Sequence, residues 1–138
     1  MVYEAMAKQT QLPRLGELEE RVLEHLWEVD EADVNETHGA VGKGRGITPN
    51  TVGSALERLH RKGLVTRAKV SHAYRYRPRL GRDELAARRV LDAVGSSRAL
   101  TGTGLLSAFV ELLAEVDEAS LDRLEDLIAE HRRREEGR

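Results

Sequence analysis

The sequence contains no cysteine among its 138 residues. Thiolate metal ligands, cysteine nucleophiles, CxxC redox motifs and disulfide bridges all need cysteine sulfur, so the sequence excludes each of them. It also has no apolar run near the ~18 residues of a membrane span, and residues 1–11 have no apolar segment typical of a signal peptide. We therefore expect a cytoplasmic protein that does not bind membranes directly.

Aromatic residues are also scarce, at 4% of the chain, whereas 40% of all residues are apolar. The core must therefore be built mainly from Leu, Val and Ala, which suit helices. The five histidines are dispersed without HxH or HExxH spacing, and no nucleophile with a base, paired carboxylates or cofactor loop can be identified. The sequence predicts one α-rich domain or two small ones, with no metal, no cofactor and no enzymatic activity.

The net charge of -2 conceals a basic segment between two acidic ones. Residues 43–79 hold ten basic side chains and a single acidic one, Glu57, whereas residues 1–42 hold three basic and ten acidic side chains, and residues 80–138 hold nine and thirteen. A charge run is usually a solvated face, but these basic residues are interleaved with apolar ones, first at helical and then at strand spacing. This pattern favours a folded positive surface that meets a polyanion.

Two helices and a glycine-rich loop are predicted at the start of the chain. Apolar residues at helical spacing predict an amphipathic helix over residues 15–29. Asn35 is a suitable N-cap for a short second helix over residues 36–41. Three glycines within residues 42–46 predict a loop, and this loop lacks the GxxxxGK[ST] pattern of a nucleotide site.

A third helix is predicted from Pro49 to about Lys62. Thr48 can cap its first turn, proline suits its first position, and Gly63 ends it. Its apolar residues recur at helical spacing and therefore face inward. The polar residues predicted on its exposed face are Asn50, Thr51, Ser54, Glu57, Arg58 and Arg61.

A β-hairpin is predicted after the third helix. Residues 64–70 and 73–78 alternate between apolar and polar, and the two residues between them form the turn. The alternation predicts a polar side made almost entirely of Arg and Lys, with Tyr74 and Tyr76 packed inward rather than reaching a DNA backbone. Three helices followed by a basic hairpin are the elements of a winged helix-turn-helix domain, in which the third helix lies in the major groove and the hairpin, or wing, follows the adjoining backbone.

The C-terminal part of the chain is predicted to be helical. Helices are expected over residues 84–94, capped by Asp83, over 105–116 and over 120–134, with a loop over 95–104. Seven of the twelve residues in the middle helix are large and apolar, and they span an arc of roughly 160° at 100° per residue. Three short helices cannot cover so wide an arc, so a second copy of the chain is the expected partner, with packing against the N-terminal half as the alternative. The predicted dimer interface comprises Leu105, Leu106, Phe109, Val110, Leu113, Leu124 and Ile128.

Three stretches of the sequence together form a recognisable pattern. They are Leu15-Gly16-Glu17-Leu18-Glu19 with Leu26-Trp27, then Thr48-Pro49-Asn50-Thr51-Val52 with Leu56 to Val65, and Ala73-Tyr74-Arg75-Tyr76-Arg77-Pro78. In these stretches the chain resembles the penicillinase-repressor family of the BlaI/MecI/CopY type, over about residues 13–84. We predict a mainly α fold with a small β-hairpin wing, in which residues 13–80 form a winged helix DNA-binding domain and residues 81–138 a helical dimerisation domain.

The resemblance implies a homodimeric repressor that binds a pseudo-palindromic operator in double-stranded DNA, with TACA/TGTA-type half-sites. It places the helix that begins at Pro49 in the major groove. In this family, repression is commonly relieved when a membrane-bound sensor metalloprotease leads to cleavage of the repressor in its C-terminal half. The resemblance therefore implies such a sensor as a further partner.

Base contacts are expected from the exposed face of the third helix, because a groove-bound helix presents these side chains to base edges. The residues concerned are Asn50, Thr51, Ser54 and Arg58, of which Arg58 could read guanine and Asn50 adenine. Phosphate contacts give affinity without sequence information. They are expected from Thr48, Arg61, Lys62, Arg67, Lys69, His72, Arg75 and Arg77.

Two residues depart from the family pattern. Gly53 stands where a larger residue is often found, and costs about 1 kcal/mol of helix propensity relative to Ala. Asn50 stands where Thr or Tyr is common, so the half-site preference is expected to differ. The residues alone leave two other functions open, a winged-helix module that binds an acidic protein and a nucleoid protein without a preferred site. Discrimination between operator and random duplex separates a repressor from the latter.

Overall fold

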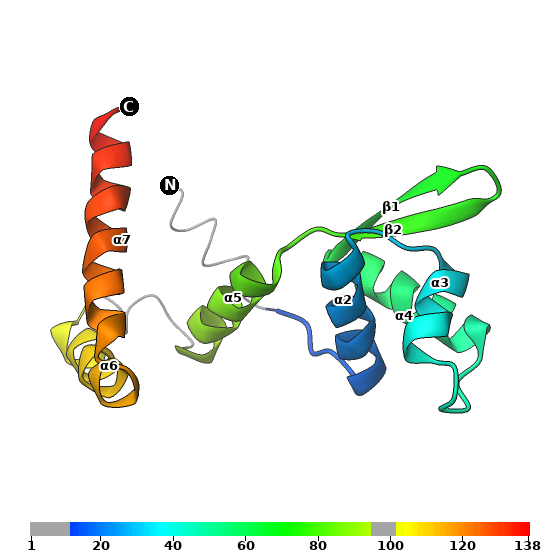
Figure 1. The fold of residues 1–138 in the computed structure, drawn as a ribbon, viewed down its shortest axis with the longest axis horizontal. Helices are drawn as coiled ribbons and strands as arrows, with labels where there is room; N and C mark the ends of the chain where they lie inside the picture. Colours follow the sequence, from blue (N-terminus) through cyan, green and yellow to red (C-terminus); the bar gives the residue numbers. More distant parts are fainter. Residues whose placement is uncertain (1–11, 95–101) are drawn as a thin grey trace. The chain divides into compact units, whose positions relative to one another are not determined.

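The chain folds into an N-terminal unit of helices with one β-hairpin, followed by a C-terminal pair of helices. The structure is a computed structural model that describes residues 12–94 and 102–138. The described residues form two compact units, an N-terminal one up to Ala93 and a C-terminal one from Val94. The elements in chain order are α2 (Glu17–Val29), α3 (Val34–Val41), α4 (Pro49–Arg61), β1 (Val65–Val70), β2 (Ala73–Pro78), α5 (Arg82–Val94), α6 (Thr103–Val116) and α7 (Ala119–Glu136), as Figure 1 shows. The predicted mainly α fold with a hairpin wing is confirmed, while residues 95–101 of the predicted loop lie outside the described residues.

The core of the N-terminal unit is almost entirely aliphatic, as the low aromatic content predicts. It joins the inner faces of α2 and α4 to the first residues after α4 and to one tyrosine of the hairpin. Its large buried side chains include Val22, Leu23, Leu26, Val52, Leu56, Leu59, Leu64, Val65, Tyr76 and Leu85. Because α4 buries one face in this core, its polar face is held toward solvent.

The start of α3 corrects one prediction. Its N-cap is Asp33 rather than Asn35, and the helix begins at Val34. The Asp33 carboxylate accepts a hydrogen bond from the backbone N–H of Glu36 at 2.8 Å, and the Glu36 carboxylate accepts one from the N–H of Asp33 at 3.1 Å. This reciprocal capping box satisfies backbone donors that the first turn of a helix leaves without partners.

The α4 helix begins and ends close to the predicted residues. Thr48 Oγ1 accepts from the backbone N–H of Thr51 at 3.2 Å, and Pro49 is the first helical residue. The helix ends at Arg61, and Gly63 adopts a φ of +78°, a left-handed conformation that favours glycine at helix ends. The chain then turns directly into β1, so the hairpin is fixed next to the end of α4.

The hairpin places its basic residues on both faces, which corrects the prediction of a single basic side. Cross-strand partners share a face in an antiparallel pair, and Arg67 lies opposite Tyr76 whereas Arg75 lies opposite Ala68. One face therefore carries Arg67, Lys69, Tyr74 and Tyr76, and the other carries Thr66, Ala68, Arg75 and Arg77. Of the two tyrosines predicted to pack inward, Tyr76 is 3% exposed but Tyr74 is 42% exposed.

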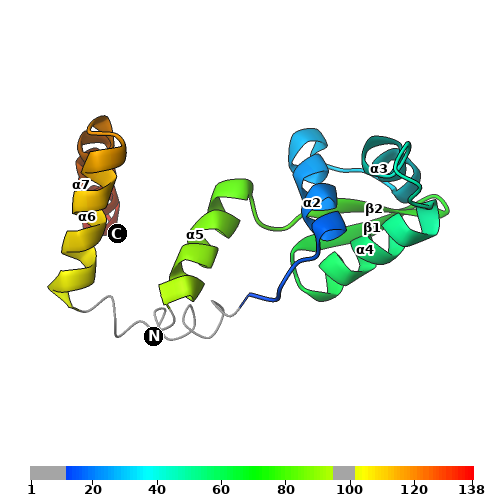
Figure 2. The same ribbon diagram turned by 90° about the horizontal axis from the view of Figure 1, so that it is seen from below.

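A short backbone bridge holds the hairpin against the segment between α2 and α3. The N–H of Ala32 donates to the carbonyl of Tyr76 at 3.0 Å, and the N–H of Tyr76 donates to the carbonyl of Ala32 at 2.8 Å. Figure 2 shows α4 on one side of the hairpin and α2 and α3 on the other. The two faces of the hairpin consequently meet different parts of the N-terminal unit.

The first helix after the hairpin, α5, contacts α2 and the core of the N-terminal unit. Trp27 Nε1 donates to the carbonyl of Leu80 at 2.8 Å, and the Arg82 guanidinium lies 5.3 Å from the Trp27 ring centroid and 2.6 Å from Glu24. Leu85 is buried in the core. The helix begins at Arg82, so Asp83 lies in its first turn rather than at its N-cap.

The C-terminal unit consists of α6 and α7, which leave many large apolar side chains exposed. They are Leu105, Leu106, Phe109, Val110, Leu112, Val116, Leu127 and Ile128. None of the described residues of this unit is buried. No helix within residues 12–94 or 102–138 combines the length and the hydropathy that a membrane crossing needs.

Candidate nucleic-acid interface

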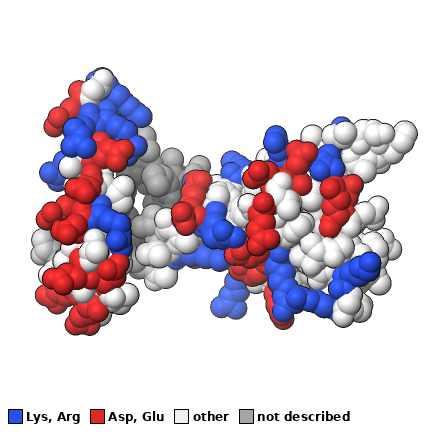
Figure 3. Space-filling model, in the orientation of Figure 1, with Lys and Arg blue, Asp and Glu red and all other residues white. Residues whose placement is uncertain are grey.

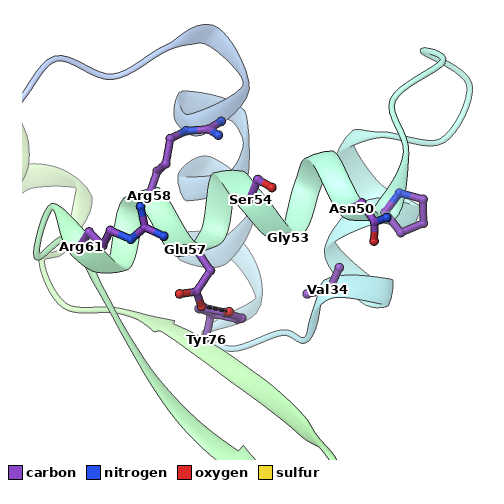
Figure 4. Close-up of a pocket in the computed structure, with 9 residues that line it drawn as sticks. Val34, Asn50, Gly53, Ser54, Glu57, Arg58, Arg61 and Tyr76 are labelled. Carbon is purple, nitrogen blue, oxygen red and sulfur yellow. Dashed lines mark hydrogen bonds between the residues drawn. The ribbon is translucent and has the colours of Figure 1, made fainter.

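The exposed face of α4 forms one wall of an open groove of about 640 Å³. The groove continues onto the start of α3 and onto the hairpin, as Figure 4 shows. Its lining comprises Val34, Pro49, Asn50, Gly53, Ser54, Glu57, Arg58, Arg61 and Tyr76. Three residues predicted to contact bases, Asn50, Ser54 and Arg58, thus lie along one side of one helix.

Thr48 and Thr51 sit at the start of α4, and their hydroxyl groups bind one another. The two Oγ1 atoms are 2.9 Å apart, and Thr48 Oγ1 also accepts from the Thr51 N–H. Both side chains are exposed, but Thr51 does not line the groove. In this geometry both hydroxyl groups stabilise the helix start.

Glu57 connects α4 to the hairpin, a role that sequence analysis missed. Its Oε1 accepts from the Tyr76 hydroxyl at 2.6 Å and pairs with the Arg67 guanidinium, which also stacks 4.3 Å from the Tyr74 ring centroid. Burial, with the hydrogen bond to Glu57, raises the pKa of Tyr76 to about 12. The Tyr76 hydroxyl and Arg67 together hold the pKa of Glu57 below its usual value despite partial burial. The available signal was that Glu57 is the one acidic residue in residues 43–79.

Two of the predicted DNA-contacting cations are held by a carboxylate of α2. Lys62 Nζ lies 2.6 Å from Glu19 Oε2, and Arg58 Nε lies 3.4 Å from Glu19 Oε1. The Glu19 side chain is only 8% exposed, whereas that of Arg58 is 45% exposed. Burial raises the pKa of Glu19, but the hydrogen bond and charge of Lys62, with hydrogen bonds from the Gly16 N–H and Arg58, outweigh it, so the pKa lies below its ordinary value.

The opposite face of the hairpin is paired with Glu31, between α2 and α3, and with Glu36 in the first turn of α3. Arg75 Nε lies 2.9 Å from Glu31 and its Nη1 lies 2.8 Å from Glu36, while Arg77 Nε lies 3.3 Å from Glu31. The N–H of Asp33 and the guanidinium of Arg75 hold the pKa of Glu36 below its usual value. Sequence analysis missed these pairs because they join residues that lie about 40 positions apart.

The remaining predicted phosphate contacts, Arg61, Lys69 and His72, are exposed. Within the described part of the chain, the side chains of these three residues make no hydrogen bond and have no carboxylate within 4.0 Å. Figure 3 shows acidic and basic side chains next to one another on the N-terminal unit, in agreement with the pairing described above. Five of the ten basic side chains in residues 43–79 are therefore paired with carboxylates.

Comparison with known proteins gives the family. A family model for the penicillinase repressor matches residues 15–130. "Transcriptional regulator BlaI" of Mycobacterium tuberculosis, strains CDC 1551 / Oshkosh and ATCC 25618 / H37Rv, is 36% identical over 120 residues, which are 86% of this chain and 86% of the relative.

Two solved structures are similar at lower identity. The solution structure of the DNA binding domain of the repressor BlaI has a TM-score of 0.48 and 23% identity, over 54% of this chain and 90% of that one. The crystal structure of the AntR antimony-specific transcriptional repressor has a TM-score of 0.40 and 21% identity, over 59% and 68%. On the extent of the family match and of the identity to BlaI, the chain belongs to the penicillinase-repressor family of transcriptional regulators.

Proposed function

We propose that this penicillinase-repressor-type protein acts as a homodimer on a pseudo-palindromic operator in double-stranded DNA. The observation that supports the proposal best is the exposed face of α4, on which Asn50, Ser54 and Arg58 line an open groove next to the wing. An α-helix fits the major groove of B-DNA, about 12 Å wide, and base edges there offer distinct patterns of donors and acceptors. In the proposed complex, α4 is the recognition helix.

Each of these side chains suits a base contact. The Asn50 carboxamide can bind adenine through one donor and one acceptor, and the Arg58 guanidinium can donate two hydrogen bonds to guanine. Glu19 holds Arg58 through Nε, which leaves the terminal nitrogens for a base. The Ser54 hydroxyl lies between them and can donate or accept. The basic residues of the wing contact phosphates of the DNA backbone on one side of α4 in the proposed complex.

The proposed dimer interface is the apolar surface of α6 and α7. Exposed Leu105, Leu106, Phe109 and Val110 follow one another along α6, and Ile128 is exposed on α7. Burying a large apolar side chain contributes about 1.5–3 kcal/mol, so a few of these residues can support association. A twofold dimer presents two equivalent recognition helices, which matches the symmetry of two half-sites.

A salt titration of binding tests the proposal. A TACA/TGTA-type palindrome is compared with a scrambled duplex of equal length, and the stoichiometry is measured at saturation. A preference for the palindrome of about a thousandfold or more, with two chains per site, supports the dimeric repressor. Equal binding to both duplexes contradicts an operator of this type, and no binding to either favours a protein partner for the basic surface.

We also propose relief of repression by cleavage in the C-terminal half, downstream of a membrane-bound sensor metalloprotease. Family membership supports this proposal. Its test is the length of the repressor chain in cells before and after derepression of its target genes, measured by immunoblotting. Loss of full-length chain together with derepression supports cleavage, whereas derepression with an intact chain contradicts it.

A further inference from the structure

Ion pairing divides the basic residues of 43–79 into two groups. The first group lies within 4.0 Å of carboxylates and comprises Arg58, Lys62, Arg67, Arg75 and Arg77. The second has no carboxylate within that distance among the described residues and comprises Lys43, Arg45, Arg61, Lys69 and Arg79. Free cations can meet phosphates without first giving up a partner, and two of them, Lys43 and Arg45, lie in the loop between α3 and α4.

The base of this loop is fixed, whereas its tip is exposed. The His38 ring donates through Nε2 to the Ile47 carbonyl at 2.7 Å, and the N–H of Lys43 donates to the His38 carbonyl at 2.9 Å. Gly44 and Gly46 have φ values of +86° and +72°, so their conformations favour glycine. Both loop cations are exposed, and the anchored base keeps them close to the start of α4.

The loop and the wing lie on opposite sides of α4. In Figure 4 the loop rises beyond Asn50 on one side of the helix, and the strands lead away on the other side. A helix in the major groove has a phosphate backbone on each side of it. With the wing over one backbone, the loop is placed toward the other.

The acidic residues of α2 form no ion pairs with Lys43 or Arg45. Arg45 lines a shallow groove together with Glu20, Glu24 and Glu28, but none of these carboxylates lies within 4.0 Å of its guanidinium. Glu20 instead pairs with Arg89, and Glu24 pairs with Arg82. The charge of the loop is therefore available to a ligand.

We propose that Lys43 and Arg45 bind backbone phosphates on the side of the recognition helix opposite the wing. This inference rests on the proposed function, since it names a further part of the same DNA-binding surface. Phosphate contacts strengthen binding to every sequence equally and increase its dependence on salt. The loop thus contributes affinity and orientation, while the bases are read by α4.

The test compares the Lys43→Ala/Arg45→Ala protein with the wild type on the palindrome and on the scrambled duplex. The slope of log K against log salt is negative, and each lost phosphate contact reduces its magnitude by about 0.9. Loss of two contacts per chain therefore reduces the magnitude of the slope by roughly 3.6 for a dimer. The ratio of the affinities for the palindrome and the scrambled duplex is expected to stay unchanged. A Lys43→Arg/Arg45→Lys protein keeps both charges and is expected to keep the slope. The control is Arg132→Ala/Arg133→Ala, which removes two charges from α7.

The outcomes separate this inference from the function on which it rests. If the wild type binds neither duplex, the proposed function fails. If the wild type binds and the loop variant has the same slope and affinity, the loop contact is refuted. A loss confined to the palindrome also refutes it, because that result would assign base contacts to the loop.

Discussion

At the scale of single residues, the Glu57 carboxylate fixes the wing to the recognition helix. It accepts from the Tyr76 hydroxyl at 2.6 Å and pairs with Arg67, so one carboxylate holds both strands of the hairpin. Tyr76 is buried, and its backbone is bridged to Ala32. The position of the wing relative to α4 therefore depends on a small polar network rather than on apolar packing alone.

Tyr76→Phe is expected to destabilise the protein by about 1.5–3 kcal/mol, the usual contribution of a hydrogen bond to a charged group. The change removes the hydroxyl and leaves the ring in place. Urea unfolding measures the loss. The matched control is Tyr74→Phe, because Tyr74 is 42% exposed and its hydroxyl has no hydrogen bond to the described residues. Equal losses in the two variants would contradict a structural role for the Glu57–Tyr76 bond.

Glu19 is expected to make stability depend on pH in the acid range. Its folded-state pKa is lowered, so the stabilisation it provides is present above its ordinary pKa of 4.5 and is lost as the pH falls through the lowered value. Glu19→Gln is expected to cost about 1.5–3 kcal/mol at pH 7, and the difference from wild type should shrink toward pH 3. Unfolding by urea at several pH values measures this. Glu17→Gln removes only an exposed pair with Arg21. Exposed pairs contribute little to stability, so this control should lose far less stability than Glu19→Gln at every pH. An E19Q deficit that is constant with pH would rule out the ion pair as its cause.

At the scale of elements, the sequence predicts α4 and the hairpin well because their ends are marked by local chemistry. Thr48 and Pro49 start the helix and Gly63 ends it, as predicted. The predicted start of α3 was two residues too late. Asn35 and Asp33 are both good N-caps, and only the hydrogen bond between Asp33 and Glu36 decides between them. The predicted two-residue turn already implies the observed register, in which Val70 lies opposite Ala73 and Arg67 and Arg75 lie on different faces. The ion pairs between distant residues leave no such local signal in the sequence.

Two glycines near α4 should respond to alanine with opposite signs. A Cβ at Gly42 would lie 2.7 Å from the His38 ring, which is held by its bond to Ile47, and 3.2 Å from a Val52 methyl group. Gly42→Ala is therefore expected to cost about 1–3 kcal/mol through overpacking. A Cβ at Gly53 would lie 3.7 Å from the Val34 methyl groups, an ordinary contact, so Gly53→Ala should gain up to about 1 kcal/mol of helix propensity. Thermal unfolding distinguishes them, and a shift of the same sign in both variants would refute this account.

At the scale of the whole molecule, the two units differ in how they satisfy their apolar residues. The N-terminal unit buries its own core and includes α5 through Trp27 and Leu85. The C-terminal unit buries none of its described residues. As a member of a regulator family the chain is not an enzyme, as the sequence predicted. The family resemblance predicted a transcriptional regulator, whereas the charge pattern alone predicted only a basic segment between two acidic ones.

Phe109→Asp is expected to convert the proposed dimer into a monomer. Phe109 is 50% exposed in the middle of α6, and a carboxylate there could not be buried between two copies without a large desolvation cost. Sedimentation equilibrium should give a single chain, and operator affinity should fall because the two half-sites are no longer bound by one particle. Val29→Asp, at a similarly exposed apolar residue of α2, should leave the dimer intact. If F109D remained dimeric with unchanged operator affinity, α6 would not form the interface, and its exposed apolar residues would need another partner.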